Sequence, residues 1–225
     1  MGGIAPPTSE EELLRRARAL AGHPLGAIAE RHGVPLADVR RAKGWIGQLL
    51  EIALGATAAS RSAPDFEAIG VELKTVPVDA AGRPRETTFV CTADLERMGG
   101  QPWERSRVRA KLARVLWIPV EADPRIELPW RRVGMPLLWS PAGEEEALLR
   151  ADWEEFAELV GHGQVESITA HRGRVLQMRP KGANAAQVRW GVDEEGLPVR
   201  VAPRGFYLRS AFVEGILRRA FVVGG

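Results

Sequence analysis

Three charged side chains in the first half of the chain could act together on a phosphate. They lie in the stretch DFEAIGVELKT, which contains Asp65, Glu72 and Lys74. Side chains at positions i and i+2 of a β-strand project from the same face, so we expect Glu72 and Lys74 to stand side by side while Leu73 faces the core. Asp65 precedes a tight turn at Gly70 and could reach the same end of the strand.

The residue types favour metal-dependent hydrolysis. Asp65 and Glu72 would repel each other at short distance unless a cation lay between them, and hard oxygen ligands suit Mg²⁺. Such an ion can bind a phosphate oxygen and activate a water, and the ammonium group of Lys74 could orient that water. The group therefore indicates phosphodiester hydrolysis. The motif is short, however, and an exposed ion pair on a sheet edge, worth at most about 1 kcal/mol, is the competing interpretation.

Two further charges enlarge the group. Glu51 lies in IGQLLEIALGA, where its helical neighbours are small or mostly apolar, so its carboxylate needs a partner that the metal cluster could supply. Lys111 precedes the very apolar stretch LARVLWIPV, so its ammonium group could lie at the mouth of a sheet.

Helices and strands follow one another in a way that favours an α/β protein. Ser9 and Glu12 have the spacing of a capping box before a first helix, PLGAIAERHG reads as a second helix that stops at Gly33, and a third helix includes Glu51. After Pro64 the hydrophobic period changes to two, and GVELKTVPV, RETTFVCTA and KLARVLWIPVEA are expected to be strands of one sheet.

The C-terminal half has a similar alternation. GEEEALLRADWEEFAELVG is an amphipathic helix with an acidic face, and the short strands VESITAH, RVLQMRP and PVRVAP are expected after it. A last helix is expected to begin at Ser210, which we take as its N-cap. The pattern predicts a single domain over residues 1–225, with approximate lobes at 1–125 and 126–225.

Composition excludes little by itself. The chain has 225 residues, 45% of them hydrophobic, and its 31 Lys and Arg against 29 Asp and Glu give a net charge of +2. The part from Gln164 onward holds ten Lys or Arg and five Asp or Glu, so this basic third could face a polyanion. The single cysteine, Cys91, fits a reducing compartment. Without a signal sequence or an apolar span, we expect a cytoplasmic protein that has no membrane contact.

At a larger scale the sequence resembles the MutH family, the strand-discriminating endonucleases of methyl-directed mismatch repair, which are related to type II restriction enzymes. The similarity runs in order from about Ser9 to Phe221. It is carried by KGWIGQLLEIALGA, DFEAIGVELKTVPVDAAGRPRETTFV, RAKLARVLWIPVE, GMPLLWSP, DWEEFAELV and PRGFYLRSAF.

The resemblance implies a fold, a chemistry and partners. The fold would be restriction-endonuclease-like, with a mixed central sheet flanked by helices and two lobes around a DNA-binding cleft. A monomer would nick the unmethylated strand of double-stranded DNA at hemimethylated GATC sites, using Mg²⁺ held by Asp65 and Glu72. MutL would activate it after MutS detects a mismatch. The family's catalytic residues would fall on Asp65, Glu72, Lys74, Glu51 and Lys111.

The resemblance also assigns residues to DNA. Arg179, Pro180 and Lys181 would belong to the recognition loop, and Tyr207, the only tyrosine, would sense the adenine methyl group. Phe89 would lie near the bases, although an aromatic residue in a strand is usually part of a core. Apart from the resemblance, Lys43 is a candidate phosphate contact because it stands before the tight turn GWIG. A further basic residue is expected soon after PKGAN, but residues 185–188 carry no charge, which leaves the register of this loop open.

Other classes of function compete with the nuclease. The stretch at about residues 25–45 imitates a helix-turn-helix that would place Arg40 and Arg41 in the major groove of DNA, as in a regulator without catalysis. The acidic helix around Glu144 to Glu158 could be a protein-binding surface, alone or for MutL. The four histidines show no metal-ligand spacing, and phosphate-loop and serine-hydrolase motifs are absent from the sequence.

Overall fold

The computed structural model describes residues 4–36, 42–57, 63–181, 189–193 and 195–222 of a mixed α/β chain. The chain divides into two compact units: unit 1 has residues 1–86, 114–140 and 214–225, and unit 2 has 87–113 and 141–213. The units interleave along the sequence because each sheet joins strands that are far apart in the chain. None of the described helices is both long enough and apolar enough to cross a membrane.

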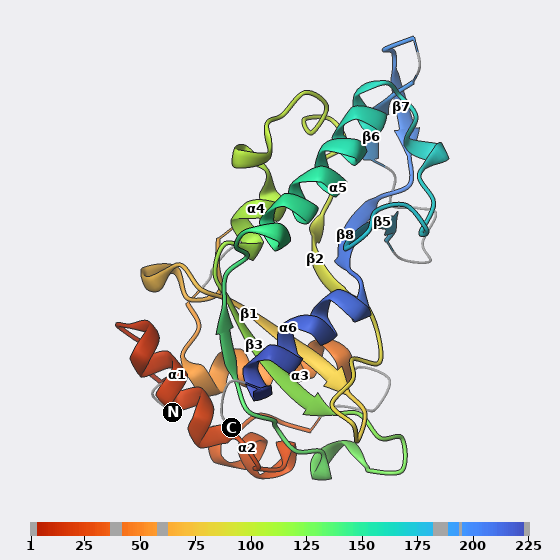
Figure 1. The fold of residues 1–225 in the computed structure, drawn as a ribbon. Helices are drawn as coiled ribbons and strands as arrows, with labels where there is room; N and C mark the ends of the chain where they lie inside the picture. Colours follow the sequence, from red (N-terminus) through yellow and green to blue (C-terminus); the bar gives the residue numbers. More distant parts are fainter. Residues whose placement is uncertain (1–3, 37–41, 58–62, 182–188, 194, 223–225) are drawn as a thin grey trace. The chain divides into compact units, whose positions relative to one another are not determined.

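Unit 1 is built on a three-stranded sheet in the order β1-β3-β4 (Figure 1). Its strands are β1 (Glu72–Val78), β3 (Val115–Glu121) and β4 (Leu137–Trp139). The first pair is parallel, with Glu72 opposite Val115, and the second pair is antiparallel. The mixed sheet expected from the sequence is therefore confirmed.

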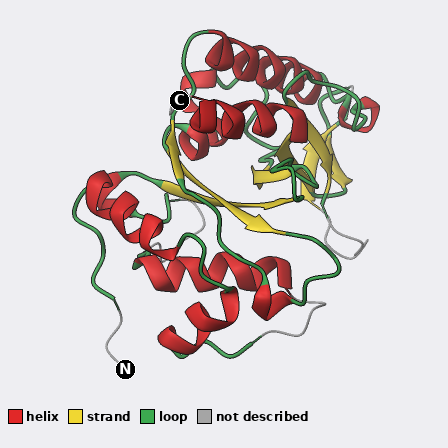
Figure 2. Cartoon of the chain, turned by 60° about the horizontal axis from the view of Figure 1, so that its bottom comes forward, coloured by secondary structure: helices red, strands yellow, loops and turns green. Residues whose placement is uncertain are grey.

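Three N-terminal helices lie on one face of this sheet (Figure 2). They are α1 (Glu10–Leu20), α2 (Leu25–His32) and α3 (Ala42–Leu54). Their apolar side chains form one buried cluster with Leu73 of β1 and with Leu116, Ile118 and Val120 of β3. Because neighbouring residues of a strand face opposite sides, Glu72 and Lys74 lie on the other face of the sheet.

Unit 2 contains an antiparallel sheet in the order β2-β8-β5 and a separate hairpin. The sheet strands are β2 (Thr88–Thr92), β8 (Arg204–Leu208) and β5 (Leu176–Pro180), and the hairpin joins β6 (Arg189–Val192) to β7 (Pro198–Val201). The long helix α5 (Glu144–Gly161) packs on β5, and its Phe156 ring meets the Phe206 ring of β8 edge to face. Leu176 and Met178 of β5 and Phe206 and Leu208 of β8 are buried.

Shorter elements complete the chain. Helix α4 (Arg107–Leu112) precedes β3, and helix α6 (Ser210–Val222) begins in unit 2 and ends in unit 1. The described residues also include the 3-10 turns η2 (Glu67–Ile69), η3 (Trp103–Arg105), η4 (Leu128–Trp130) and η5 (Val165–Ser167).

Two sequence-based expectations about strands are wrong. The stretch RETTFVCTA does form a strand, β2, but β2 pairs with β8 rather than with β1 or β3, so the expected single sheet is two sheets. The stretch VESITAH forms the 3-10 turn η5 rather than a strand. Its buried residues, Val165 and Ile168, are three positions apart, which is the spacing of a 3-10 turn and not of a strand.

The helix caps also differ in part from the prediction. The Ser9 hydroxyl accepts the Glu12 N–H as expected, but the Glu12 carboxylate accepts from Thr8 rather than from the Ser9 N–H. The hydrogen bond from the Thr8 backbone, followed by that from Arg16, lowers the pKa of Glu12 to about 2. Ser210 is the first residue of α6 rather than its cap, because the Arg209 carbonyl already accepts from Val213.

Candidate active site and nucleic-acid interface

A tight turn brings Asp65 to the start of β1. The turn η2 ends at Gly70, whose φ of +66° is a left-handed conformation that glycine adopts readily, and the Phe66 and Val71 backbones exchange hydrogen bonds across it. The chain therefore doubles back, and Asp65 Oδ2 accepts the Leu73 N–H at 2.8 Å. One carboxylate of the predicted motif thus touches the strand that carries the other two members.

Glu72 and Lys74 form a buried ion pair. Lys74 Nζ lies 2.7 Å from Glu72 Oε1, and only 4% of Glu72 is exposed to solvent. The Glu72 N–H donates to the Arg114 carbonyl at 2.9 Å, which fixes the start of β1 against β3. The competing interpretation is therefore wrong about exposure, although β1 does lie at the edge of the described sheet. Since isolation of charges from water is costly, this pair requires further favourable partners.

The other two catalytic candidates come from different helices. Glu51 is half-buried in α3, which packs against β1, so the helix that carries it touches the strand of Glu72 and Lys74. Lys111 is 5% exposed near the end of α4, in unit 2. Along the chain it stands three residues before Arg114, the residue that accepts the Glu72 N–H. The roles of both residues remain predictions.

The donor set at β1 fits the chemistry of magnesium. Within the described residues no group of three or more His, Cys, Asp or Glu side chains is arranged to hold a metal ion. Mg²⁺ is commonly held by only one or two carboxylates, with waters and substrate phosphate filling its other positions. Asp65, which accepts the Leu73 N–H, and Glu72, which pairs with Lys74, would provide such a pair.

Four of the six residues that were assigned to DNA meet on one face of the unit 2 sheet. Phe89 of β2 and Tyr207 of β8 are paired in register, and their ring centroids are 5.3 Å apart. The Arg179 guanidinium lies 4.2 Å from the centre of the Tyr207 ring, and Lys181 Nζ lies 4.6 Å from the centre of the Phe89 ring. Two cations and two aromatic rings thus form one surface, which we call the cation–aromatic cluster.

Two threonines hold the cations of this cluster in place. Arg179 donates to Thr87 Oγ1 at 2.9 Å, and Lys181 donates to Thr92 Oγ1 at 2.8 Å. Phe89 remains 36% exposed, so the alternative that it is a core residue is wrong. Partly exposed cations beside flat rings can contact both the phosphates and the bases of a nucleic acid. Both threonines lie in the quoted stretch RETTFVCTA, but their identity as partners of residues 179 and 181 needed the sheet register.

Gly205 leaves room for the two rings. A Cβ atom at this position would lie 3.0 Å from Phe89 Cε2 and 3.2 Å from Tyr207 Cε2, which is too close unless a ring moves. The glycine precedes Tyr207 by two residues and therefore faces the same side of β8. The motif PRGFYL contained this glycine, and strand alternation could have identified it.

The structure shows less about the other candidates for DNA contact. Pro180 is exposed at the end of β5, opposite Arg204 of β8. Lys43 is the second residue of α3, and its side chain lies outside the described part of the structure. Residues 182–188, where the register of the recognition loop was left open, also lie outside the described residues. The same holds for the arginines at 40 and 41, on which the helix-turn-helix alternative depends.

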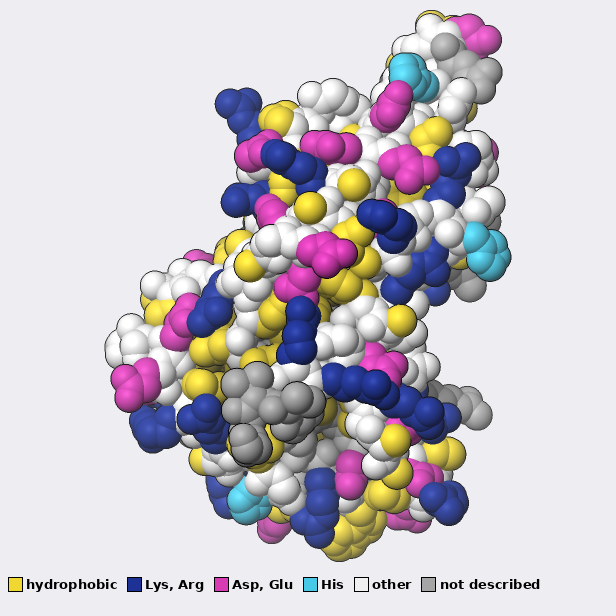
Figure 3. Space-filling view, viewed as in Figure 1, with side chains coloured by type: hydrophobic (Ala, Val, Ile, Leu, Met, Phe, Trp, Pro, Cys, Tyr) yellow, Lys and Arg dark blue, Asp and Glu magenta, His cyan; other side chains and the backbone are white. Residues whose placement is uncertain are grey.

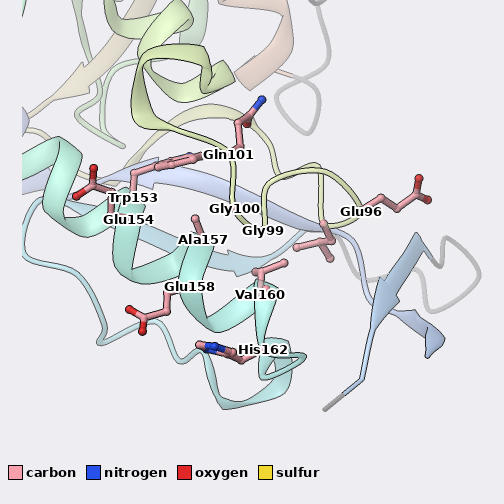
Figure 4. A pocket seen from close by; sticks show the side chains of 12 residues that line it. Glu96, Gly99, Gly100, Gln101, Trp153, Glu154, Ala157, Glu158, Val160 and His162 are labelled. Atoms are coloured by element: carbon pink, nitrogen blue, oxygen red, sulfur yellow. The ribbon is translucent and has the colours of Figure 1, made fainter. Parts of the chain in front are cut away.

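A hollow of about 600 Å³ lies between α5 and the loop at residues 95–101 (Figure 4). Its apolar lining includes Trp153, Ala157 and Val160, and its acidic lining comprises Glu96, Glu154 and Glu158. On the face shown in Figure 3, acidic side chains lie along α5 with some lysine and arginine side chains between them. The acidic lining is unsuited to a phosphate backbone. In this respect the hollow differs from the cation–aromatic cluster, whose cations suit a phosphate.

Comparison with known proteins points to one family. Residues 54–152 match the model of the family described as MutH, DNA mismatch repair enzyme MutH. A DNA mismatch repair protein MutH of Yersinia enterocolitica is 53% identical over 221 residues, which cover 97% of this chain and 96% of that protein. The protein of the same name from Salmonella typhimurium is also 53% identical, over 98% of this chain and 96% of its own.

Proposed function

Because this chain belongs to the MutH family of DNA mismatch repair endonucleases, we propose that it nicks the unmethylated strand at hemimethylated GATC sites by Mg²⁺-dependent hydrolysis. Its mixed α/β architecture is that of the restriction-endonuclease-like fold of this family. The observation that carries the proposal is the arrangement at the start of β1, where Asp65 contacts the Leu73 N–H and Glu72 pairs with Lys74 in a buried position.

In the proposed reaction, water attacks phosphorus and the bond to the 3′-oxygen breaks, leaving a 5′-phosphate and a 3′-hydroxyl. Asp65 and Glu72 would hold Mg²⁺, which when bound polarises a phosphate oxygen and lowers the pKa of a coordinated water. The Lys74 ammonium group, kept in place by Glu72, would orient the attacking water by donating a hydrogen bond. Glu51 and Lys111 would support the carboxylates and the scissile phosphate.

Sequence recognition is proposed for the cation–aromatic cluster. An arginine can bind guanine O6 and N7 with two hydrogen bonds, and Arg179 is held beside Tyr207 where it could do so. Lys181 could bind a second guanine or a phosphate, and Phe89 could contact a base. Tyr207 would sense the adenine methyl group. The basic third of the chain supports contact with a polyanion, whose affinity would fall steeply with salt.

We further propose that MutL activates the enzyme by docking at the hollow beside α5. A basic segment of MutL with apolar side chains would fit the apolar floor and the three glutamates there. Exchange of Glu154 and Glu158 for lysine should then weaken stimulation by MutL and leave the slower nicking without MutL unchanged. Equal stimulation of the variant and the unaltered protein would refute this docking site.

The central experiment uses plasmids that are unmethylated, hemimethylated or fully methylated at GATC. With Mg²⁺, the protein should nick the first two and spare the third, and Asp65→Ala should abolish nicking while DNA binding is retained. Binding without any nicking by the unaltered protein would instead favour the regulator with a helix-turn-helix at residues 25–45. That alternative is already disfavoured, since the family consists of endonucleases and the apolar residues of α2 and α3 are committed to the core of unit 1.

A further inference from the structure

Gln177 is a buried polar side chain with an unused hydrogen-bond acceptor. It lies on β5 and is 6% exposed. Its Nε2 donates to the Ala170 carbonyl at 2.6 Å, whereas its Oε1 atom is buried and has no hydrogen-bond partner among the residues that the structure describes. Because a sealed and unpaired carbonyl is unfavourable, such an atom in a native protein calls for an explanation.

The orientation of this amide is fixed by its surroundings. Turning the amide over would set Oε1 against the Ala170 carbonyl, where two acceptors would repel each other. The loop that carries Ala170 is itself held by Arg209, whose guanidinium donates to the carbonyls of His171 and Gly173 at 2.8 and 3.0 Å. The free acceptor therefore points away from this loop.

The sheet register places the acceptor beside the proposed methyl sensor. Gln177 is directly opposite Tyr207, so the two side chains project from the same face with Cβ atoms roughly 5 Å apart. Strand β8 lies between β2 and β5, which leaves Tyr207 with Phe89 on one side and Gln177 on the other. The Tyr207 ring contacts the Phe89 ring and the Arg179 guanidinium. Among the described residues, no hydrogen bond of the Tyr207 hydroxyl group is found.

We propose that Gln177 is a positioning residue for methyl discrimination. When DNA draws the Arg179 guanidinium away from the Tyr207 ring, the phenol turns from Phe89 toward Gln177 and donates its hydroxyl hydrogen to Oε1. The ring is then fixed in a position where it clashes with an adenine methyl group. Without the acceptor the ring can swing aside and admit a methylated base. The inference rests on the proposed function, in which Tyr207 senses the methyl group.

A double-mutant cycle tests the coupling. Gln177→Met keeps the length of the side chain but removes the acceptor, and it should lower the ratio of nicking rates on hemimethylated and fully methylated DNA about tenfold. In a Tyr207→Phe background the same change should alter that ratio by less than about twofold. Gln164→Met, at an exposed glutamine, is the matched control. An equal fall in both backgrounds, or an unchanged ratio, overturns the proposal.

A spectroscopic test uses the single tyrosine of the chain. Protein labelled with ¹³C at tyrosine Cζ gives one resonance, which reports hydrogen bonding of the phenol. Addition of a hemimethylated GATC duplex, with Ca²⁺ in place of Mg²⁺, should shift it in the direction of hydroxyl donation, and Gln177→Met should lose the shift. If the variant does not fold, the unaltered protein decides, since a resonance unmoved by duplex binding overturns the proposal.

The two levels of failure are distinguishable. An unaltered protein that nicks no GATC duplex contradicts the proposed function. An enzyme that nicks and discriminates normally while the tyrosine resonance stays in place contradicts only the role of Gln177.

Discussion

Asp152 should be a major source of stability for the strand that carries Arg179 and leads to Lys181. This carboxylate, on α5, is 3% exposed and accepts three backbone N–H groups, from Arg174, Val175 and Leu176, at 2.7 to 2.8 Å. It therefore ties the start of β5 to the helix. In Asp152→Ala the three donors lose this partner, and water has little access to replace it.

The size of the effect follows from these contacts. A net loss of roughly 1 to 1.5 kcal/mol for each of the three hydrogen bonds gives a fall of about 3 to 5 kcal/mol in the free energy of unfolding. For a chain of this length that corresponds to a fall of roughly 10 °C in Tm. Urea unfolding followed by circular dichroism and by tryptophan fluorescence would measure it.

A neighbouring residue offers a matched control. Glu155, on the same helix, pairs at 2.9 Å with Arg172 of the loop that precedes β5, but both side chains are more than 40% exposed. Exposed pairs contribute at most about 1 kcal/mol, so Glu155→Ala should have little effect on Tm. If Asp152→Ala is no less stable than Glu155→Ala, the reasoning from buried hydrogen bonds is refuted.

Three further predictions concern activity. Lys74→Met should reduce nicking by at least about 100-fold while DNA affinity changes little, and near-normal nicking would remove Lys74 from the mechanism. Gly205→Ala should displace the Phe89 or Tyr207 ring and lower discrimination between hemimethylated and fully methylated DNA. Gly215→Ala, whose Cβ meets no described atom within 4 Å, should not. Equal ratios of nicking rates on the two DNAs for both variants would contradict this. Chelation by EDTA should abolish nicking and added Mg²⁺ should restore it, so activity that persists in EDTA would exclude the metal.

The candidate catalytic group at β1 shows what local sequence can predict. The alternation of β1 put Glu72 and Lys74 on one face and Leu73 on the other, and the structure confirms both placements. The burial of the ion pair could not be predicted, because it depends on elements packed around the strand rather than on the strand itself. The contact of Asp65 with the Leu73 N–H likewise depends on how the turn at Gly70 closes.

The cation–aromatic cluster depended more heavily on tertiary structure. The sequence and its family resemblance named Phe89, Arg179, Lys181 and Tyr207 one by one, without showing that their side chains touch. Their contact required β2 to pair with β8 instead of β1, a choice between partners more than a hundred residues apart. The sequence did not indicate a role for Gln177, since an unpartnered acceptor exists only after folding has enclosed it.

By itself, the sequence determined which residues form helices and strands in most of the chain, the face on which each strand residue lies, and the family. These properties follow from neighbours within a few positions and from similarity along the whole chain. Tertiary structure decided which strands pair, which charges are buried and which hydrogen bonds remain unmade. The physical reason is that period-two alternation fixes the direction of a side chain, whereas its partner and its exposure to water depend on segments that only the folded chain brings together.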